Sequence, residues 1–209
     1  NCMTGQWGDC DNSVDACTNP SFNVTPSGFG NVEEFDAMNF GISNPQVNPN
    51  TTPGNMGCLM SGELNSTWLL ITVTGAGTLE FSMGTAGTFN CFDWIMWPYD
   101  PAATCNDIAN NIQAPVACNW NGACTGITGM ANAGNLPAGG DQTDFENGLN
   151  VNAGDQFMIC FSNFSSASTG VPLDFFGTAQ VTCGNTIGAT ICSGENAFVV
   201  ALGGVAYNW

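Results

Sequence analysis

The stretch TWLLITVTGAGTLEFSM, residues 67–83, decides the fold class. In its first half, Leu69, Ile71 and Val73 alternate with less apolar positions, which is the two-residue period of a β-strand with one buried face. Residues 79–83 repeat that alternation after the Gly-Ala-Gly turn at residues 75–77. The pattern predicts two strands joined as a hairpin.

Further strands are expected on both sides of this stretch. Residues 22–25 and 32–40 are weaker candidates, and residues 92–97 are apolar on both faces, as in an interior strand. The alternating runs 157–161 and 173–181 are expected to pair with each other, with a short helix in residues 101–111 and a long loop in residues 119–150. With 27 glycines and 10 prolines, these runs predict an all-β, jelly-roll-type β-sandwich with disulfide-stapled loops.

The charge composition excludes several classes of function. The chain has 209 residues and 17 Asp and Glu, but no Lys, Arg or His, so its formal net charge is −17. Phosphate binding needs Lys or Arg, which excludes nucleic acid as a partner. Nucleophilic triads and histidine-based metal catalysis also lack their residues, and only a paired-carboxylate glycosidase mechanism remains open. We therefore expect that the chain is not an enzyme.

Eleven cysteines indicate an oxidising compartment, which is periplasmic, secreted or at the cell surface. Pairing between cysteines that are near in sequence predicts the disulfides Cys2–Cys10, Cys91–Cys105 and Cys118–Cys124, although spacing alone does not fix connectivity. No apolar run approaches the roughly 20 residues of a membrane helix, so no membrane insertion is expected.

Acidic residues are the candidates for metal ligands. Oxygen-rich clusters suit calcium, and a carboxylate pushed into a sandwich without basic residues needs some other neutralising partner. The candidate ligands are Glu63, Asp93, Asp141, Asp144 and Glu146. The alternative, in which the clusters are solvated turns, is equally open.

Aromatic residues near the interior strand are candidates for stacking against sugar rings. Trp94 and Trp97 point to opposite faces of one strand, so at least one of them belongs to the core. Tyr99 and Trp120 lie in loop sequence and are the candidate glycan-binding residues.

Several motifs together resemble a known family. They are CLMSGELNSTW at residues 58–68, GTLEF at 77–81, FDW at 92–94, NAGDQF at 152–157 and LDFFGTA at 173–179. Over residues 17–183 the chain resembles a β-sandwich module of large Bacteroidota surface proteins, which are exported by type IX secretion and include gliding-motility adhesins. It is also similar to bacterial pre-peptidase C-terminal domains, which are non-catalytic. TICSGE at residues 190–195 and GGVAYNW at 203–209 resemble the start of an immunoglobulin-like, PKD-like repeat.

These observations predict three segments. Residues 1–20 form a disulfide-stapled leader, residues 21–183 the sandwich, and residues 184–209 a linker with an extra strand. That strand belongs either to a following repeat or to a neighbouring subunit's sheet. Its contact residues are Cys192, Phe198, Val200 and Leu202.

The leading functional hypothesis is a secreted, cell-surface module of an adhesin or filament, with neighbouring repeats or identical subunits as partners. The alternative is a calcium-dependent carbohydrate-binding module of a secreted enzyme, with surface polysaccharide as its partner.

Overall fold

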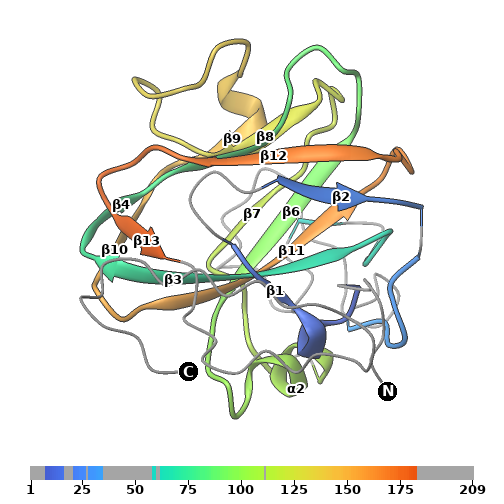
Figure 1. Cartoon of the computed structure of the whole chain (residues 1–209), viewed down its shortest axis with the longest axis vertical. Coiled ribbons are helices and arrows are strands. Elements are labelled where there is room, and N and C mark those ends of the chain that lie inside the picture. The colour runs from blue at the N-terminus through green and yellow to red at the C-terminus, as the bar shows by residue number, and fades with distance from the viewer. Residues whose placement is uncertain are drawn as a thin grey trace, which may run out of the picture.

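The computed structural model describes residues 8–16, 21–26, 28–34, 58–59, 62–110 and 112–182. Two sheets pack against each other (Figure 1). The first contains, in spatial order, β1 (Val14–Asp15), β3 (Thr67–Gly75), β11 (Gln156–Asn163), β6 (Phe92–Pro98) and β7 (Ala117–Asn119). A further strand, β13 (Gln180–Thr182), also pairs with β3.

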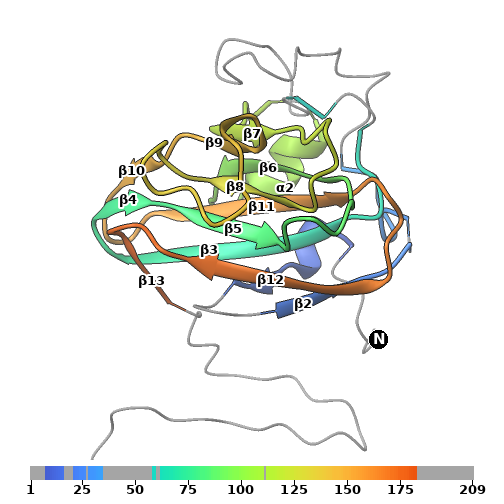
Figure 2. The same cartoon turned by 90° about the horizontal axis from the view of Figure 1, so that it is seen from above.

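The second sheet contains β2 (Ser21–Val24), β12 (Thr169–Phe175), β5 (Phe81–Gly84), β8 (Ile127–Met130) and β9 (Phe145–Glu146). Its strands β2 and β12 run side by side in Figure 2. A short ladder joins β4 (Gly77–Leu79) to β10 (Leu149–Val151). The helical turns are η1 (Cys10–Asn12), α2 (Thr104–Ala109) and η3 (Gln142–Asp144). The predicted all-β sandwich is confirmed, and the chain crosses repeatedly between its sheets, as a jelly roll does.

The main core lies between the two sheets. Phe157, Ile159 and Phe161 of β11 all belong to it, which confirms the core face expected from their alternation. The ring of Phe161 lies 5.0 Å from the ring of Phe22 in the opposite sheet. Apolar contacts between the sheets are the main source of stability in a fold of this kind.

A second core covers the outer face of the first sheet. Trp68 of β3 and Trp97 of β6 stack there with ring centroids 5.6 Å apart, and Ile108 of α2 packs in the same cluster. Strand β6 is therefore buried on both faces from Phe92 to Trp97. This confirms the interior strand and places both Trp94 and Trp97 in the core.

Strand pairing differs from the sequence-based expectation. The predicted hairpin of residues 67–83 is wrong, because β3 pairs with β1, β11 and β13 while β5 pairs with β12 and β8 in the other sheet. The expected pairing of β11 with β12 is wrong for the same reason. Residues 119–150 hold β8, β9 and part of β10 rather than one loop, and residues 32–34 are not in a strand. In the two wrong pairings, β3 and β5, and β11 and β12, lie in opposite sheets, and both sheets close over the core.

Three disulfides join distant parts of the described chain. They are Cys10–Cys105, Cys58–Cys118 and Cys91–Cys124, with sequence separations of 95, 60 and 33. The predicted pairs Cys2–Cys10, Cys91–Cys105 and Cys118–Cys124 are therefore wrong, although disulfide bonding itself is confirmed. Sequence proximity is a poor guide here because the bridges join η1 to α2, residue 58 to β7, and the β5–β6 turn to the β7–β8 turn.

Part of the expected leader belongs to the sandwich. Val14 and Asp15 pair in parallel with Leu69 and Leu70 of β3, and Ala16 is buried in the main core. The calls on Cys2 and on the segment 184–209, with Cys192, Phe198, Val200 and Leu202, lie outside the described residues. Within the described part, no helix has the length and apolar character to cross a membrane.

Candidate functional site

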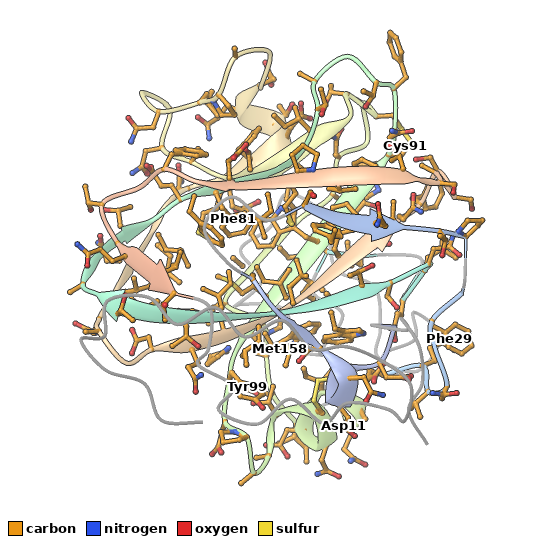
Figure 3. All side chains as sticks on the ribbon, in the orientation of Figure 1. Asp11, Phe29, Phe81, Cys91, Tyr99 and Met158 are labelled. Atoms are coloured by element: carbon orange, nitrogen blue, oxygen red, sulfur yellow. A yellow bond between two sulfur atoms is a disulfide. The ribbon has the colours of Figure 1, made fainter. Side chains whose placement is uncertain are left out.

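An open cleft of about 660 Å³ lies at the C-terminal end of β6, where Tyr99 follows the strand. Its walls come from η1, the loop at residues 31–34 and the segment leading into α2, and the Cys10–Cys105 disulfide joins two of these walls. Asp11 and Tyr99 lie together at this end of the molecule in Figure 3. Four carboxylic residues line the cleft: Asp9, Asp11, Glu34 and Asp100.

Two of these carboxyl groups hold the cleft together. Asp9 accepts hydrogen bonds from the backbone N–H groups of Asn31 and Val32, at 2.6 and 2.9 Å. In return, Glu34 accepts one from the backbone N–H of Cys10 at 2.8 Å. The segment 8–16 and the loop 28–34 are therefore joined by hydrogen bonds to two buried carboxyl groups.

Glu34 also contacts a second buried carboxyl group, Glu63. Burial raises the pKa of Glu34 to about 7, whereas burial and the neighbouring charge of Glu34 raise the pKa of Glu63 to about 10. Glu63 is therefore protonated at neutral pH, and its hydrogen bond to Glu34 favours the charged form of Glu34. Glu63 further accepts hydrogen bonds from Ser66 and from the Trp68 indole, the latter at 2.8 Å.

The buried thiol of Cys160 lies outside any disulfide, on the outer face of the first sheet. Burial raises its pKa well above the usual range, and Glu63 and Glu34, when ionised, act in the same direction. A thiol that stays protonated and buried is a poor nucleophile. Cys160 therefore has a packing role.

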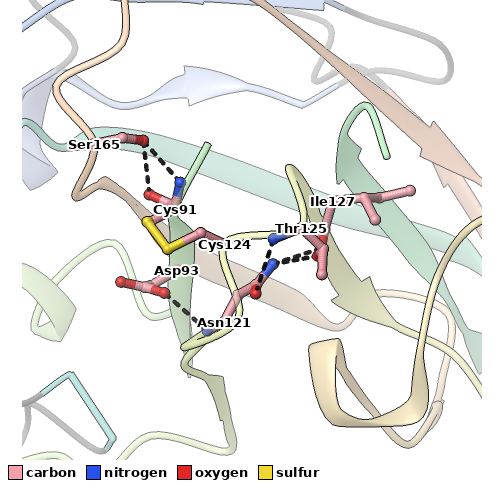
Figure 4. The surroundings of a disulfide bond; sticks show 7 residues. All are labelled: Cys91, Asp93, Asn121, Cys124, Thr125, Ile127 and Ser165. Atoms are coloured by element: carbon pink, nitrogen blue, oxygen red, sulfur yellow. Dashed lines mark hydrogen bonds between the residues drawn. A yellow bond between two sulfur atoms is a disulfide. The ribbon is translucent and has the colours of Figure 1, made fainter. Parts of the chain in front are cut away.

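The opposite end of β6 carries Asp93, next to the Cys91–Cys124 disulfide (Figure 4). Asp93 is 4% exposed, and its carboxylate accepts a hydrogen bond from the backbone N–H of Asn121 at 2.9 Å. Burial raises the pKa of Asp93 to about 7, and the Asn121 hydrogen bond partly offsets this. The side chain of Asn121 then bonds to Thr125 and to the carbonyl of Ile127.

Thr125 connects this network to Asp144, which is another predicted calcium ligand. Its hydroxyl donates to Asp144 at 2.8 Å, so Asp93 and Asp144 belong to one chain of hydrogen bonds. Burial raises the pKa of Asp144 and that of Glu146. Asp141 is exposed, and hydrogen bonds from Thr143 lower its pKa.

Backbone N–H groups and neutral side chains take the place of basic side chains in these contacts. Glu80, which is 2% exposed, shows the same arrangement, because it accepts a hydrogen bond from the backbone N–H of Asn132 at 2.8 Å. It also accepts one from the side chain of Asn135 at 2.8 Å. A buried carboxylate needs donors, and in a chain without Lys, Arg or His loop amides supply them.

The structure does not gather the predicted calcium ligands into one site. Among the described residues, no group of three acidic or cysteine side chains is arranged to hold a metal ion. Glu63 lies beside Glu34, Asp93 and Asp144 share the Asn121 network, and Asp141 bonds to Thr143. Each of these four carboxyl groups already has a hydrogen-bond donor.

Calcium binding stays a prediction, which thermal melting tests. A ligand that binds only the folded chain raises its Tm by mass action. A rise on adding calcium that a chelator reverses, and that Asp141→Asn weakens, would confirm the prediction. Identical melting curves with calcium and with chelator would contradict it.

The two candidate glycan-binding aromatics lie far apart. Tyr99 follows the last residue of β6, whereas Trp120 follows Asn119, which pairs with Trp94 near the first residue of that strand. At about 3.3 Å per residue the strand separates them by roughly 20 Å. Tyr99 and Trp120 therefore do not form one platform.

The sequence did not predict a role for Glu34, Phe89 or Phe164. For Phe89 a signal is present, because a phenylalanine in the turn sequence Gly87-Thr88-Phe89-Asn90 is expected to be exposed.

The chain matches no protein-family model, no curated protein and no solved structure. The case for its function therefore depends on the geometry of its own residues.

Proposed function

We propose that the chain is a non-catalytic, extracellular structural or adhesive module of a cell-surface adhesin or filament. The observation that carries the proposal is the long-range cross-linking of the sandwich. The three disulfides fasten η1 to α2, residue 58 to β7, and the β5–β6 turn to the β7–β8 turn. Such bridges persist in an oxidising environment and suit a part that must keep its shape outside the cell.

The arrangement of the carboxyl groups supports a non-catalytic role. A glycosidase needs two carboxyl groups about 5 to 9.5 Å apart on either side of the bond that it cleaves. Glu34 and Glu63 are instead hydrogen-bonded to each other and buried, which leaves no room for a sugar between them. Asp93 is buried and bonded to a loop amide.

A carbohydrate-binding role is the second candidate, and one observation favours it. Five aromatic side chains of the described residues are exposed. Three of them, Phe89, Trp120 and Phe164, lie close in sequence to the Cys91–Cys124 disulfide or to Ser165, which bonds to Cys91. Exposed aromatic rings on rigid turns are suited to contact sugar rings. This role is compatible with adhesion, because an adhesin also has to bind a surface.

Adhesion can be measured with coated beads under flow. Beads that carry the purified chain are expected to attach to cells of the producing organism, and soluble chain should compete for the attachment. Beads coated with an unrelated protein of similar negative charge are the control. Equal retention of both kinds of bead would contradict an adhesive role.

A further inference from the structure

Three turns of the sandwich meet at the Cys91–Cys124 disulfide. The disulfide joins the β5–β6 turn to the β7–β8 turn. The β11–β12 turn joins them through Ser165, whose hydroxyl accepts a hydrogen bond from the backbone N–H of Cys91 at 2.8 Å (Figure 4). This junction lies at the opposite end of the molecule from the acidic cleft, as Cys91 and Tyr99 show in Figure 3.

Each of the three turns carries an exposed aromatic residue next to the junction. Phe89 is two residues before Cys91, Trp120 is one residue before Asn121, and Phe164 is one residue before Ser165. Their exposed fractions are 82%, 42% and 49%, respectively. We name these three residues the aromatic tip. Exposed aromatic surface gathered in one place marks an interaction site more often than scattered apolar residues do.

The backbone of the tip is strained. Phe89 has a φ of +58°, in the left-handed region that bulky side chains rarely adopt. Cys124 and Ser166, in the other two turns, have φ values of +54°. Such strain persists only where the surroundings enforce it, and it gathers at functional sites. For Phe89 the strain is not offset by burial of the side chain, because the ring is 82% exposed.

The tip is also held rigidly. The Gly126 N–H donates to the carbonyl of Asn90 at 3.0 Å, and the Gly87 N–H donates to the carbonyl of Thr125 at 2.8 Å. The indole of Trp120 lies against Gly122, where a Cβ atom would come within 2.7 Å of the ring. Rings that are fixed before binding lose little conformational entropy when a ligand arrives.

The charge of the chain excludes acidic ligands from the tip. A net charge of −17 without any basic side chain repels nucleic acids, acidic polysaccharides and anionic lipids. A neutral sugar polymer carries no charge to repel. The C–H faces of its rings pack on aromatic rings, and its hydroxyl groups can bond to exposed backbone and side-chain groups of the turns.

We propose that the aromatic tip binds a neutral polysaccharide by stacking sugar rings on Phe89, Trp120 and Phe164. This inference deepens the adhesive role, on which it rests, by naming its surface and its ligand class.

Binding of soluble neutral glucan, mannan and xylan, with alginate as an acidic comparison, tests the inference by affinity electrophoresis. At least one neutral polymer is expected to bind and alginate is not. Phe89→Asn and Trp120→Ala should each weaken that binding about tenfold, the loss expected for one stacking contact. Ile112→Asn is the matched control, because Ile112 is 67% exposed and lies beyond α2 at the other end.

Thermal melting separates a binding defect from a folding defect. Asparagine tolerates the left-handed backbone conformation better than phenylalanine does, so Phe89→Asn should melt at the wild-type temperature or higher while it binds less. Absence of binding to every neutral polymer, or wild-type binding by both tip variants, would overturn the inference. If beads carrying Phe89→Asn still adhere to cells as wild-type beads do, the adhesive role stands and the tip is not its surface.

Discussion

Reduction of the disulfides is expected to unfold the described domain at neutral pH and moderate temperature. In the chain-entropy account, closing loops of 33, 60 and 95 residues stabilises a fold by about 4 kcal/mol each. A domain is typically stable by only about 5 to 15 kcal/mol in total. Loss of all three bridges therefore removes most or all of the stability, which denaturant titration with and without reductant will measure.

Single bridges can be compared with a matched cysteine variant. The double variant Cys58→Ala with Cys118→Ala should lower the free energy of unfolding by about 4 kcal/mol. Cys160→Ala removes a buried thiol without breaking a bridge and should cost only about 1 kcal/mol. Equal losses in the two proteins would contradict the stabilising role of the bridge.

Peptide mapping without reductant should recover Cys10 linked to Cys105. The digestion needs a protease other than trypsin, because the chain has no Lys or Arg.

Replacement of Asp93 by Asn is expected to stabilise the protein at pH 8. Burial raises the folded-state pKa of Asp93 from 3.8 to about 7. A carboxyl group with a raised pKa contributes stability that is fully present below pH 3.8 and is lost as the pH rises to about 7. Asparagine keeps an oxygen that accepts from the Asn121 N–H but carries no buried charge. The gain at pH 8 should be about 2 to 4 kcal/mol.

The pH dependence of unfolding distinguishes this cause from general charge repulsion. The wild-type free energy of unfolding should fall from about pH 4 to about pH 7 through Asp93 and Glu34, because burial raises both pKa values to about 7. It should fall further toward pH 10 through Glu63, whose pKa is raised to about 10. Asp93→Asn should remove part of the first fall. Asp174→Asn is the control. Asp174 is exposed on β12, so its replacement removes one surface charge and leaves the buried charges unchanged. If both variants gain equally, burial of Asp93 is not the cause.

The sequence predicted the strands better than their partners. The alternation of residues 69–73, 79–83 and 157–161 located β3, β5 and β11, because a two-residue period reports directly which face is buried. It does not report which sheet a strand joins. Both pairings based on nearness in sequence were therefore wrong, as were the short-range disulfides. In this fold β3 and β5, and β11 and β12, lie in opposite sheets, and the long-range contacts that pair each of these strands leave no local signal.

Part of the candidate site was also open to prediction. The absence of basic residues singled out Glu63 and Asp93 as buried carboxyl groups that need a partner, and both are buried. Their partners are loop amides and Glu34, which no spacing in the sequence indicates. The placement of Phe89 and Phe164 likewise depends on three turns that lie far apart in sequence and meet through one disulfide and a hydrogen bond to Ser165.

Attachment of intact cells under flow tests the adhesive role most directly. Cells of the producing organism that lack this chain are expected to attach less than wild-type cells, and restoring the chain should restore attachment. The strain restored with Cys58→Ala and Cys118→Ala should attach poorly if the cross-linked fold carries the function. Undiminished attachment of cells without the chain, with the chain shown by antibody labelling to be on the surface of wild-type cells, would contradict the account.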